Sequence, residues 1–160
     1  MNIRRVDLDG SGDQQVWSGS SVTDLALDLV NSYIYWSDGG TIYRSPLSSA
    51  LVPTPVIVTG NTVTRIAVDV GGGMVYYLDT TAFEIRRVPV SGGAYTSVVS
   101  ASGYGVAVDP FEAKVYWSVE TGGTINRIDV ANTNGSGGAE TVVSETSTAN
   151  AGRVAIFLWP

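Results

Sequence analysis

Hydrophobic and polar positions alternate along most of the chain in short runs of four to seven residues. The runs are rich in Val, Ile, Tyr and Trp, and clusters of Gly, Ser, Asn, Asp or Thr separate most of them. A period of two is typical of β-strands that bury one face, and the separating residue types are typical of turns. No stretch of helical length carries a 3.6-residue apolar period, so the pattern predicts an all-β protein.

The strand pattern repeats about every 40 residues. An aromatic run recurs three times, and its equivalent residues Tyr35, Tyr76 and Tyr116 are 41 and 40 residues apart. An aliphatic run that ends in Asp precedes each aromatic run, and a run with the pattern Ile-x-Arg and a short valine run follow it. Four strands in about 40 residues are typical of one blade of a β-propeller. The chain is therefore read as one domain, 1–160, with repeat units at about 1–20, 21–60, 61–101, 102–145 and a partial 146–160.

The position of each run within a blade accounts for its residue types. The strand nearest the propeller axis is crowded, so we expect the small residues Ala26, Ala67 and Ala107 there. The next strand lies between sheets, so we expect the large rings of Trp36, Tyr76 and Trp117 to be well buried. The repeated Asp and Arg residues are expected to form ion pairs between strands or blades, or to cap turns. These structural residues are Asp28, Asp69, Asp109, Arg44, Arg87 and Arg127.

The first repeat resembles the YWTD repeat, which is the class B repeat of the low-density lipoprotein receptor family. The resemblance rests on Tyr-Trp-Ser-Asp at 35–38, with Leu-Ala-Leu-Asp before it and Ile-Tyr-Arg after it, and it extends from about residue 3 to 157. The later copies depart from the motif at 77–78 and at Val119. The resemblance implies a six-bladed propeller on an extracellular protein that binds other proteins or neighbouring modules. It thus implies a non-catalytic interaction or assembly module that takes a protein partner. The number of strands, counted next, adds copies of the chain itself as candidate partners.

The chain holds fewer strands than six blades require. We count two outer strands at the N-terminus, three complete blades and one inner strand at 154–157, which is about fifteen strands or about four blades. Three interpretations stay open: a fragment of a longer propeller, a subunit of a homo-oligomer or polymer, or a closed ring of four blades. In a closed ring, the last inner strand would join the two N-terminal strands in one blade. Unpaired strand edges favour association between chains.

The composition narrows the classes of function. The chain contains no His and no Cys, which excludes Ser-His-Asp and Cys-His catalysis, imidazole metal sites and disulfides. The net charge is −6 and Lys114 is the single lysine, so the surface is unsuited to binding nucleic acid. No run reaches the roughly 18 apolar residues of a membrane-spanning helix, and the first eight residues contain no signal peptide core. We expect no membrane insertion, no cofactor and no enzyme activity.

Non-repeating residues in loops are the candidates for a binding site, because packing explains the repeated ones. Phe83 is the one large apolar residue in the loops that follow the aromatic strands. An aromatic anchor with an acidic border would suit a basic or neutral partner. The alternative is that Phe83 folds over its own blade. The candidate protein-binding rim is Asp38, Phe83, Glu84, Tyr104 and Glu120.

A second candidate is the sequon at Asn134, which would accept a glycan in a eukaryotic secretory pathway. It lies in a segment, 131–139, that we interpret as an insertion relative to the other repeats, and the alternative is a plain polar loop. Calcium binding by the repeated Asp residues or by 7–13 is disfavoured, since turn capping and a hairpin turn explain them.

Two other functions are alternatives to an interaction module. The first is a structural subunit of an extracellular fibre or coat. The second is a hydrolase of the lactonase type, which would need an axial metal held by Asp, Glu and Asn.

Overall fold

Every described secondary-structure element is a β-strand, as the alternating pattern predicts. The computed structural model describes residues 1–47, 52–121 and 124–144, without the side chains of 120, 121, 124–130 and 143. The predicted inner strand at 154–157 lies outside these residues. The described part includes no helix long and apolar enough to cross a membrane.

Three antiparallel sheets of four strands make up most of the structure, and in each the strands pair in chain order. The first sheet contains β3 (Val22–Asp28), β4 (Tyr33–Asp38), β5 (Thr41–Pro46) and β6 (Thr54–Val58). The second contains β7 (Val63–Asp69), β8 (Met74–Asp79), β9 (Glu84–Pro89) and β10 (Thr96–Ser100). The third contains β11 (Gly105–Asp109), β12 (Lys114–Thr121), β13 (Thr124–Asn132) and β14 (Glu140–Ser144). A separate hairpin joins β1 (Asn2–Arg5) to β2 (Gln14–Ser18).

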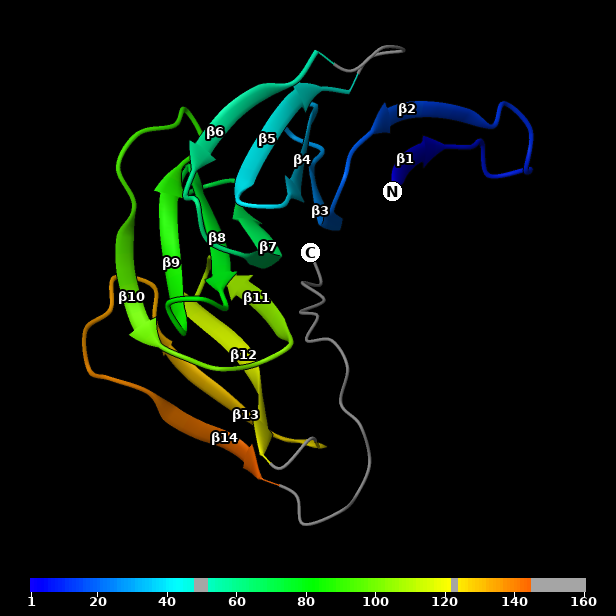
Figure 1. Ribbon diagram of the computed structural model, residues 1–160. Coiled ribbons are helices and arrows are strands. Elements are labelled where there is room, and N and C mark those ends of the chain that lie inside the picture. The colour runs from blue at the N-terminus through cyan, green and yellow to red at the C-terminus, as the bar shows by residue number, and fades with distance from the viewer. Residues whose placement is uncertain (48–51, 122–123, 145–160) are drawn as a thin grey trace.

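The three sheets are arranged around a common centre, with β3, β7 and β11 on the inner side (Figure 1). The strand β7 contacts both β3 and β11, so the inner strands carrying the repeated alanines are neighbours. Trp36, Tyr76 and Trp117 are at most 2% exposed, which confirms the predicted burial of the aromatic strands. Tyr76 and Trp117 come from different sheets and belong to one apolar cluster. The architecture is that of a partial β-propeller, because the large rings fill the space between adjacent blades.

The β1–β2 hairpin packs on the first blade and leaves part of that blade uncovered. The rings of Trp17 on β2 and Trp36 on β4 lie 5.4 Å apart between centroids. Leu25 on β3 is nevertheless 47% exposed, whereas Ile66 and Val106 at the same position of the next two blades are 4% and 7% exposed. Among the described residues no inner strand accompanies the hairpin, so one face of the first blade has less cover than its counterparts (Figure 1).

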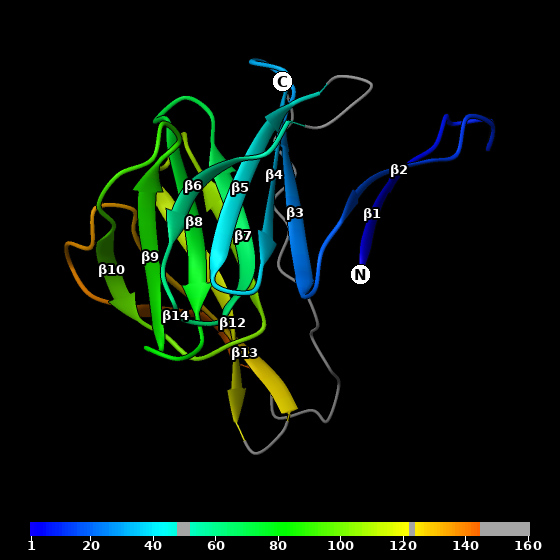
Figure 2. The same cartoon turned by 45° about the horizontal axis from the view of Figure 1, so that its top comes forward.

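The third blade departs from the predicted register. Arg44 and Arg87 lie opposite the third residue of the aromatic strand in the first two blades. In the third blade this position belongs to Val130, and Arg127 lies opposite Val119 instead. The equivalence of Arg127 with the other two arginines is therefore wrong. The cause is the longer β12–β13 hairpin, which extends beyond the ends of the neighbouring sheets (Figure 2).

Candidate functional site

The repeated aspartates at the ends of the inner strands cap turns. Asp28 accepts a hydrogen bond from the Asn31 backbone N–H at 2.9 Å, and Asp69 accepts one from the Gly72 N–H at 2.7 Å. Asp109 accepts two from the turn that follows it, at 2.9 and 3.1 Å. An Asx-type bond of this kind fixes a tight turn between antiparallel strands. The three carboxylates therefore have the structural role that their repetition predicts.

Two of the repeated arginines, Arg44 and Arg87, form no ion pair with these carboxylates. Arg44 donates from Nη1 to the carbonyl oxygen of Val90 in the next blade at 2.7 Å, and its guanidinium lies 5.5 Å from the Tyr33 ring centroid. Arg87 belongs to none of the ion pairs between described residues, and the side chain of Arg127 lies outside them. Among the described residues, Arg44 and Arg87 thus form none of the predicted ion pairs, and the prediction for Arg127 stays a prediction. A backbone carbonyl and a ring face can hold a guanidinium between blades without the desolvation of a second charge.

A different arginine, Arg86, forms the buried ionic cluster of the second blade. Its Nη1 lies 2.6 Å from Oδ2 of Asp79, its Nε lies 2.6 Å from Oε2 of Glu84, and its guanidinium lies 4.2 Å from the Tyr95 ring centroid. Burial opposes the charged form, but the Glu84 hydrogen bond and the Asp79 charge outweigh it and raise the pKa of Arg86. Glu84 was predicted as part of an acidic border, yet its charge is compensated by Arg86.

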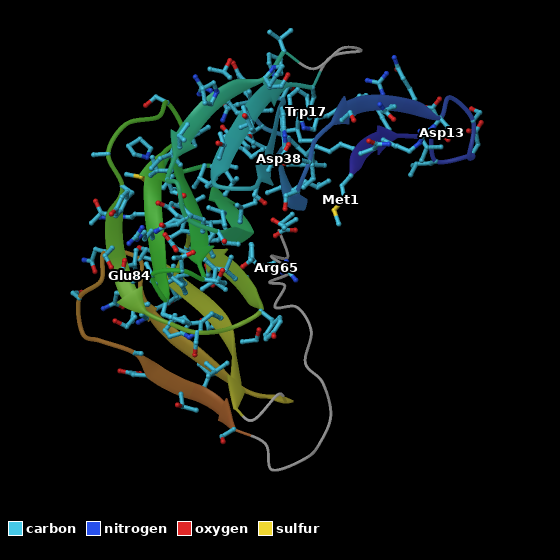
Figure 3. All side chains as sticks on the ribbon, in the orientation of Figure 1. Met1, Asp13, Trp17, Asp38, Arg65 and Glu84 are labelled. Atoms are coloured by element: carbon cyan, nitrogen blue, oxygen red, sulfur yellow. The ribbon has the colours of Figure 1, made fainter. Side chains whose placement is uncertain are left out.

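Asp38, the second predicted border carboxylate, belongs to the joint between the hairpin and the first blade. It accepts hydrogen bonds from the Ser21 backbone N–H at 2.7 Å and from the Trp17 indole N–H at 3.4 Å. Figure 3 shows Asp38 beside Trp17, and Glu84 beside the outer strands of the second blade. The Glu120 side chain lies outside the described part of the chain. Of the predicted rim, the described structure therefore brings together Phe83 and Tyr104 at one shared hollow.

Phe83 and Tyr104 form an exposed aromatic pair at one end of the second and third blades. Phe83 is 62% exposed and Tyr104 is 47% exposed, and both line a cavity of about 360 Å³. Phe83 also lines an adjacent hollow of about 520 Å³ together with Trp117 and Val119. Its backbone has φ of 55°, a left-handed conformation that is rare for a bulky residue and is often found at binding sites. The turn presents this ring to solvent between two hollows.

The cavity beside Phe83 also contains Arg65, which the sequence analysis did not select. Arg65 lies on the inner strand β7 and donates from Nη1 to the Thr64 carbonyl oxygen at 2.6 Å. Its Nε and the Thr64 hydroxyl are buried and have no hydrogen-bond partner among the described residues. The signal that could have identified Arg65 is a break in the repeat, because the equivalent residue of the first blade is Asp24.

The sequon residue Asn134 is exposed, and its side-chain oxygen accepts a hydrogen bond from the Ser136 backbone N–H at 2.9 Å. The connection 133–139 between β13 and β14 has the same length as 47–53 between β5 and β6. The interpretation of this loop as an insertion is therefore wrong, and the extra residues of the third repeat lie in the β12–β13 hairpin. Glycosylation of Asn134 stays a prediction. The described residues contain no group of three or more Asp or Glu side chains that could hold a metal ion.

Comparisons with known proteins extend this description. No family model matches the chain. The chain is similar to a structure of the nidogen/laminin complex, with 19% identity and a TM-score of 0.77 over 91% of this chain and 59% of that one. It is also similar to a gluconolactonase from Xanthomonas campestris, with 16% identity and a TM-score of 0.70 over 93% of this chain and 57% of that one. A Bacteroides thetaiotaomicron protein of unknown function matches with 17% identity and a TM-score of 0.69 over 88% of this chain and 38% of that one. The chain thus spans less than two thirds of each of these structures, and the shared property is the fold, a partial β-propeller.

Proposed function

We propose that this chain is a non-catalytic interaction module that binds a protein partner through the surface around Phe83 and Tyr104. The observation that carries the proposal is the exposure of two aromatic rings at non-repeating positions beside two adjacent hollows. Exposed aromatic residues next to pockets are the usual anchors of protein interfaces. The nidogen/laminin structure supports the proposal, since a protein of similar fold was solved there in a protein complex.

The proposed partner differs from the one that the sequence suggests. Glu84 and Asp38 are engaged in internal contacts, so they provide little free negative charge for a basic partner. The hollow contains the arginine Arg65 instead, which favours a neutral or acidic surface. An extracellular location stays part of the proposal and rests on the resemblance to the YWTD repeat. Self-association also stays part of it and rests on the unpaired strand edges of an incomplete propeller.

The proposal can be tested with peptides selected from a random display library on the whole chain. Selected peptides should bind Phe83→Ala at least about tenfold more weakly, because truncating a central aromatic anchor removes more than 1.4 kcal/mol. Phe111→Ala is the matched control, since Phe111 is 82% exposed and lies at the opposite end of β11 from Tyr104. Urea unfolding of both variants checks that the fold is retained.

The proposal is contradicted if the selection enriches no peptide over an unrelated bait. It is also contradicted if the peptides bind Phe83→Ala and Tyr104→Ala as tightly as the wild type, or lose equal affinity with Phe111→Ala.

A further inference from the structure

The cavity beside Phe83 holds a positive charge with unused hydrogen-bonding capacity. Arg65 Nη1 is engaged by the Thr64 carbonyl, but the buried Nε has no partner among the described residues. The Thr64 hydroxyl is buried without a partner in the same way. Buried polar groups are normally hydrogen-bonded, and an orphaned group beside a cavity is one that a ligand or solvent can satisfy after a small side-chain movement. Figure 3 shows Arg65 at the inner side of the sheets, close to β7 and β11.

The positions of Thr64 and Arg65 have different contacts in the first blade, where Thr23 and Asp24 occupy them. In the first blade the Asp24 carboxylate accepts a hydrogen bond from the Ile66 backbone N–H of the next blade at 3.1 Å. The hydroxyl of Thr23, equivalent to that of Thr64, lies 2.7 Å from the Ser37 hydroxyl. In the second blade, arginine replaces the acceptor, and Leu78 stands where Ser37 would be. An acceptor that joins blades in the first repeat is thus replaced in the second by a cation that lines a cavity.

The chemistry of the cavity selects its ligand. A guanidinium presents a planar fork of donors that matches the two oxygens of a carboxylate. Among the described residues that line the cavity, Arg65 is the single cationic side chain. Its charge of +1 balances one carboxylate, whereas a phosphate dianion would keep an uncompensated negative charge. The rings of Phe83 and Tyr104 add apolar contact beside this charge.

We propose that this cavity binds a carboxylate of the partner protein, with Arg65 donating to the carboxylate oxygens. The inference rests on the proposed function, because the aromatic pair is expected to dock the apolar residues beside that carboxylate. The carboxylate can belong to an Asp or Glu side chain or to a chain terminus, and both sources share the same chemistry.

The test is a titration followed by amide and guanidinium NMR shifts of the whole chain. The probes are 3-phenylpropionate and its neutral analogue 3-phenylpropionamide. The carboxylate should shift the Arg65 Nε–H and the amides of Thr64 and Tyr104 saturably, and at least about tenfold more tightly than the amide. Arg65→Gln should abolish the difference between the probes, and Arg65→Lys should retain part of it, because the charge stays but the fork is lost.

Arg87→Gln is the matched control, since Arg87 is a half-buried arginine on β9 outside the cavity. An amidated peptide with one internal Glu and a peptide with a free C-terminus and no acidic residue then distinguish the two sources. Equal binding of the two phenylpropionyl probes would overturn the inference, as would an unchanged affinity of a folded Arg65→Gln variant.

Failure of the inference can be separated from failure of the proposed function. Display-selected peptides that require Phe83 but bind Arg65→Gln normally would overturn the carboxylate site and leave the interaction surface standing. The opposite result is that the peptides bind Phe83→Ala normally while binding of 3-phenylpropionate still requires Arg65. It would overturn the interaction surface and leave the carboxylate site standing.

Discussion

Loss of the Arg86 charge should be among the costliest single changes to the stability of the second blade. The Asp79 side chain is fully buried and the Arg86 side chain is 10% exposed, so Arg86→Gln would leave a carboxylate in the interior without its counter-charge. Removing one partner of a buried ion pair costs about 3–5 kcal/mol. Asp79 keeps hydrogen bonds from the Ala82 backbone N–H and from the Asn61 amide, both at 2.8 Å. Because these donors still stabilise the Asp79 carboxylate, Arg86→Gln should lower the free energy of unfolding by about 3 kcal/mol, the lower end of that range.

Urea unfolding measures this cost directly. With a slope of about 1–3 kcal/mol per molar urea, the midpoint for Arg86→Gln should fall by about 1–3 M. The control Arg87→Gln changes the neighbouring residue, which belongs to no ion pair between described residues, and should cost less than about 1 kcal/mol. The double variant with Asp79→Asn should be more stable than the sum of the single costs predicts, because the two groups interact. The reasoning is refuted if Arg86→Gln costs no more than Arg87→Gln.

Two further variants test the packing of the blades. Burial raises the pKa of the Tyr77 phenol well above 10 in the folded state, so stability should be full below pH 10 and fall as the pH rises further. Tyr77→Phe should remove this loss, so its free energy of unfolding should fall less between pH 7 and pH 10.5 than that of the wild type; urea titrations that show an equal fall for both proteins would contradict this. A methyl group on Gly103 would collide with the Ser118 carbonyl oxygen, so Gly103→Ala should cost about 1–3 kcal/mol. Gly71→Ala places its methyl group no closer than 3.8 Å to the nearest atom and serves as the control in the same assay, where equal costs would contradict the predicted clash.

The fold could be predicted because it depends on periodic residues. A period of two within strands and of about 40 between them determines which residues face the sheets, and the aromatic and alanine positions follow from crowding near the axis. The register of the third blade could not be predicted in this way. A match of Ile-x-Arg does not reveal how far a hairpin extends, so Arg127 was aligned with Arg44 although Val130 holds that place.

The candidate site was predictable where it lies in loops and was missed where it lies on a strand. Phe83 and Tyr104 stand out because they break the repeat outside the strands. Arg65 lies inside a strand whose other residues follow the repeat, and only the comparison with Asp24 at the same register reveals it. Glu84 pairs with Arg86 two residues along the same strand, but the burial of that arginine against Asp79 of β8 depends on the sheet, and spacing along the chain does not define it.

The exposure of Leu25 indicates where local unfolding of the chain begins. In a repeat architecture, stability is approximately a sum of terms for each unit and for each interface between neighbours. The second sheet has an interface on both sides, whereas the first has a complete sheet on one side and, among the described residues, a two-stranded hairpin on the other. Leu27 on the same strand is also poorly covered, with 49% of its surface exposed. A cavity of about 370 Å³ lies between the hairpin and β3. Of the first two blades, the hairpin and β3 should therefore unfold locally first, and amide hydrogens of β7 and β8 should exchange last.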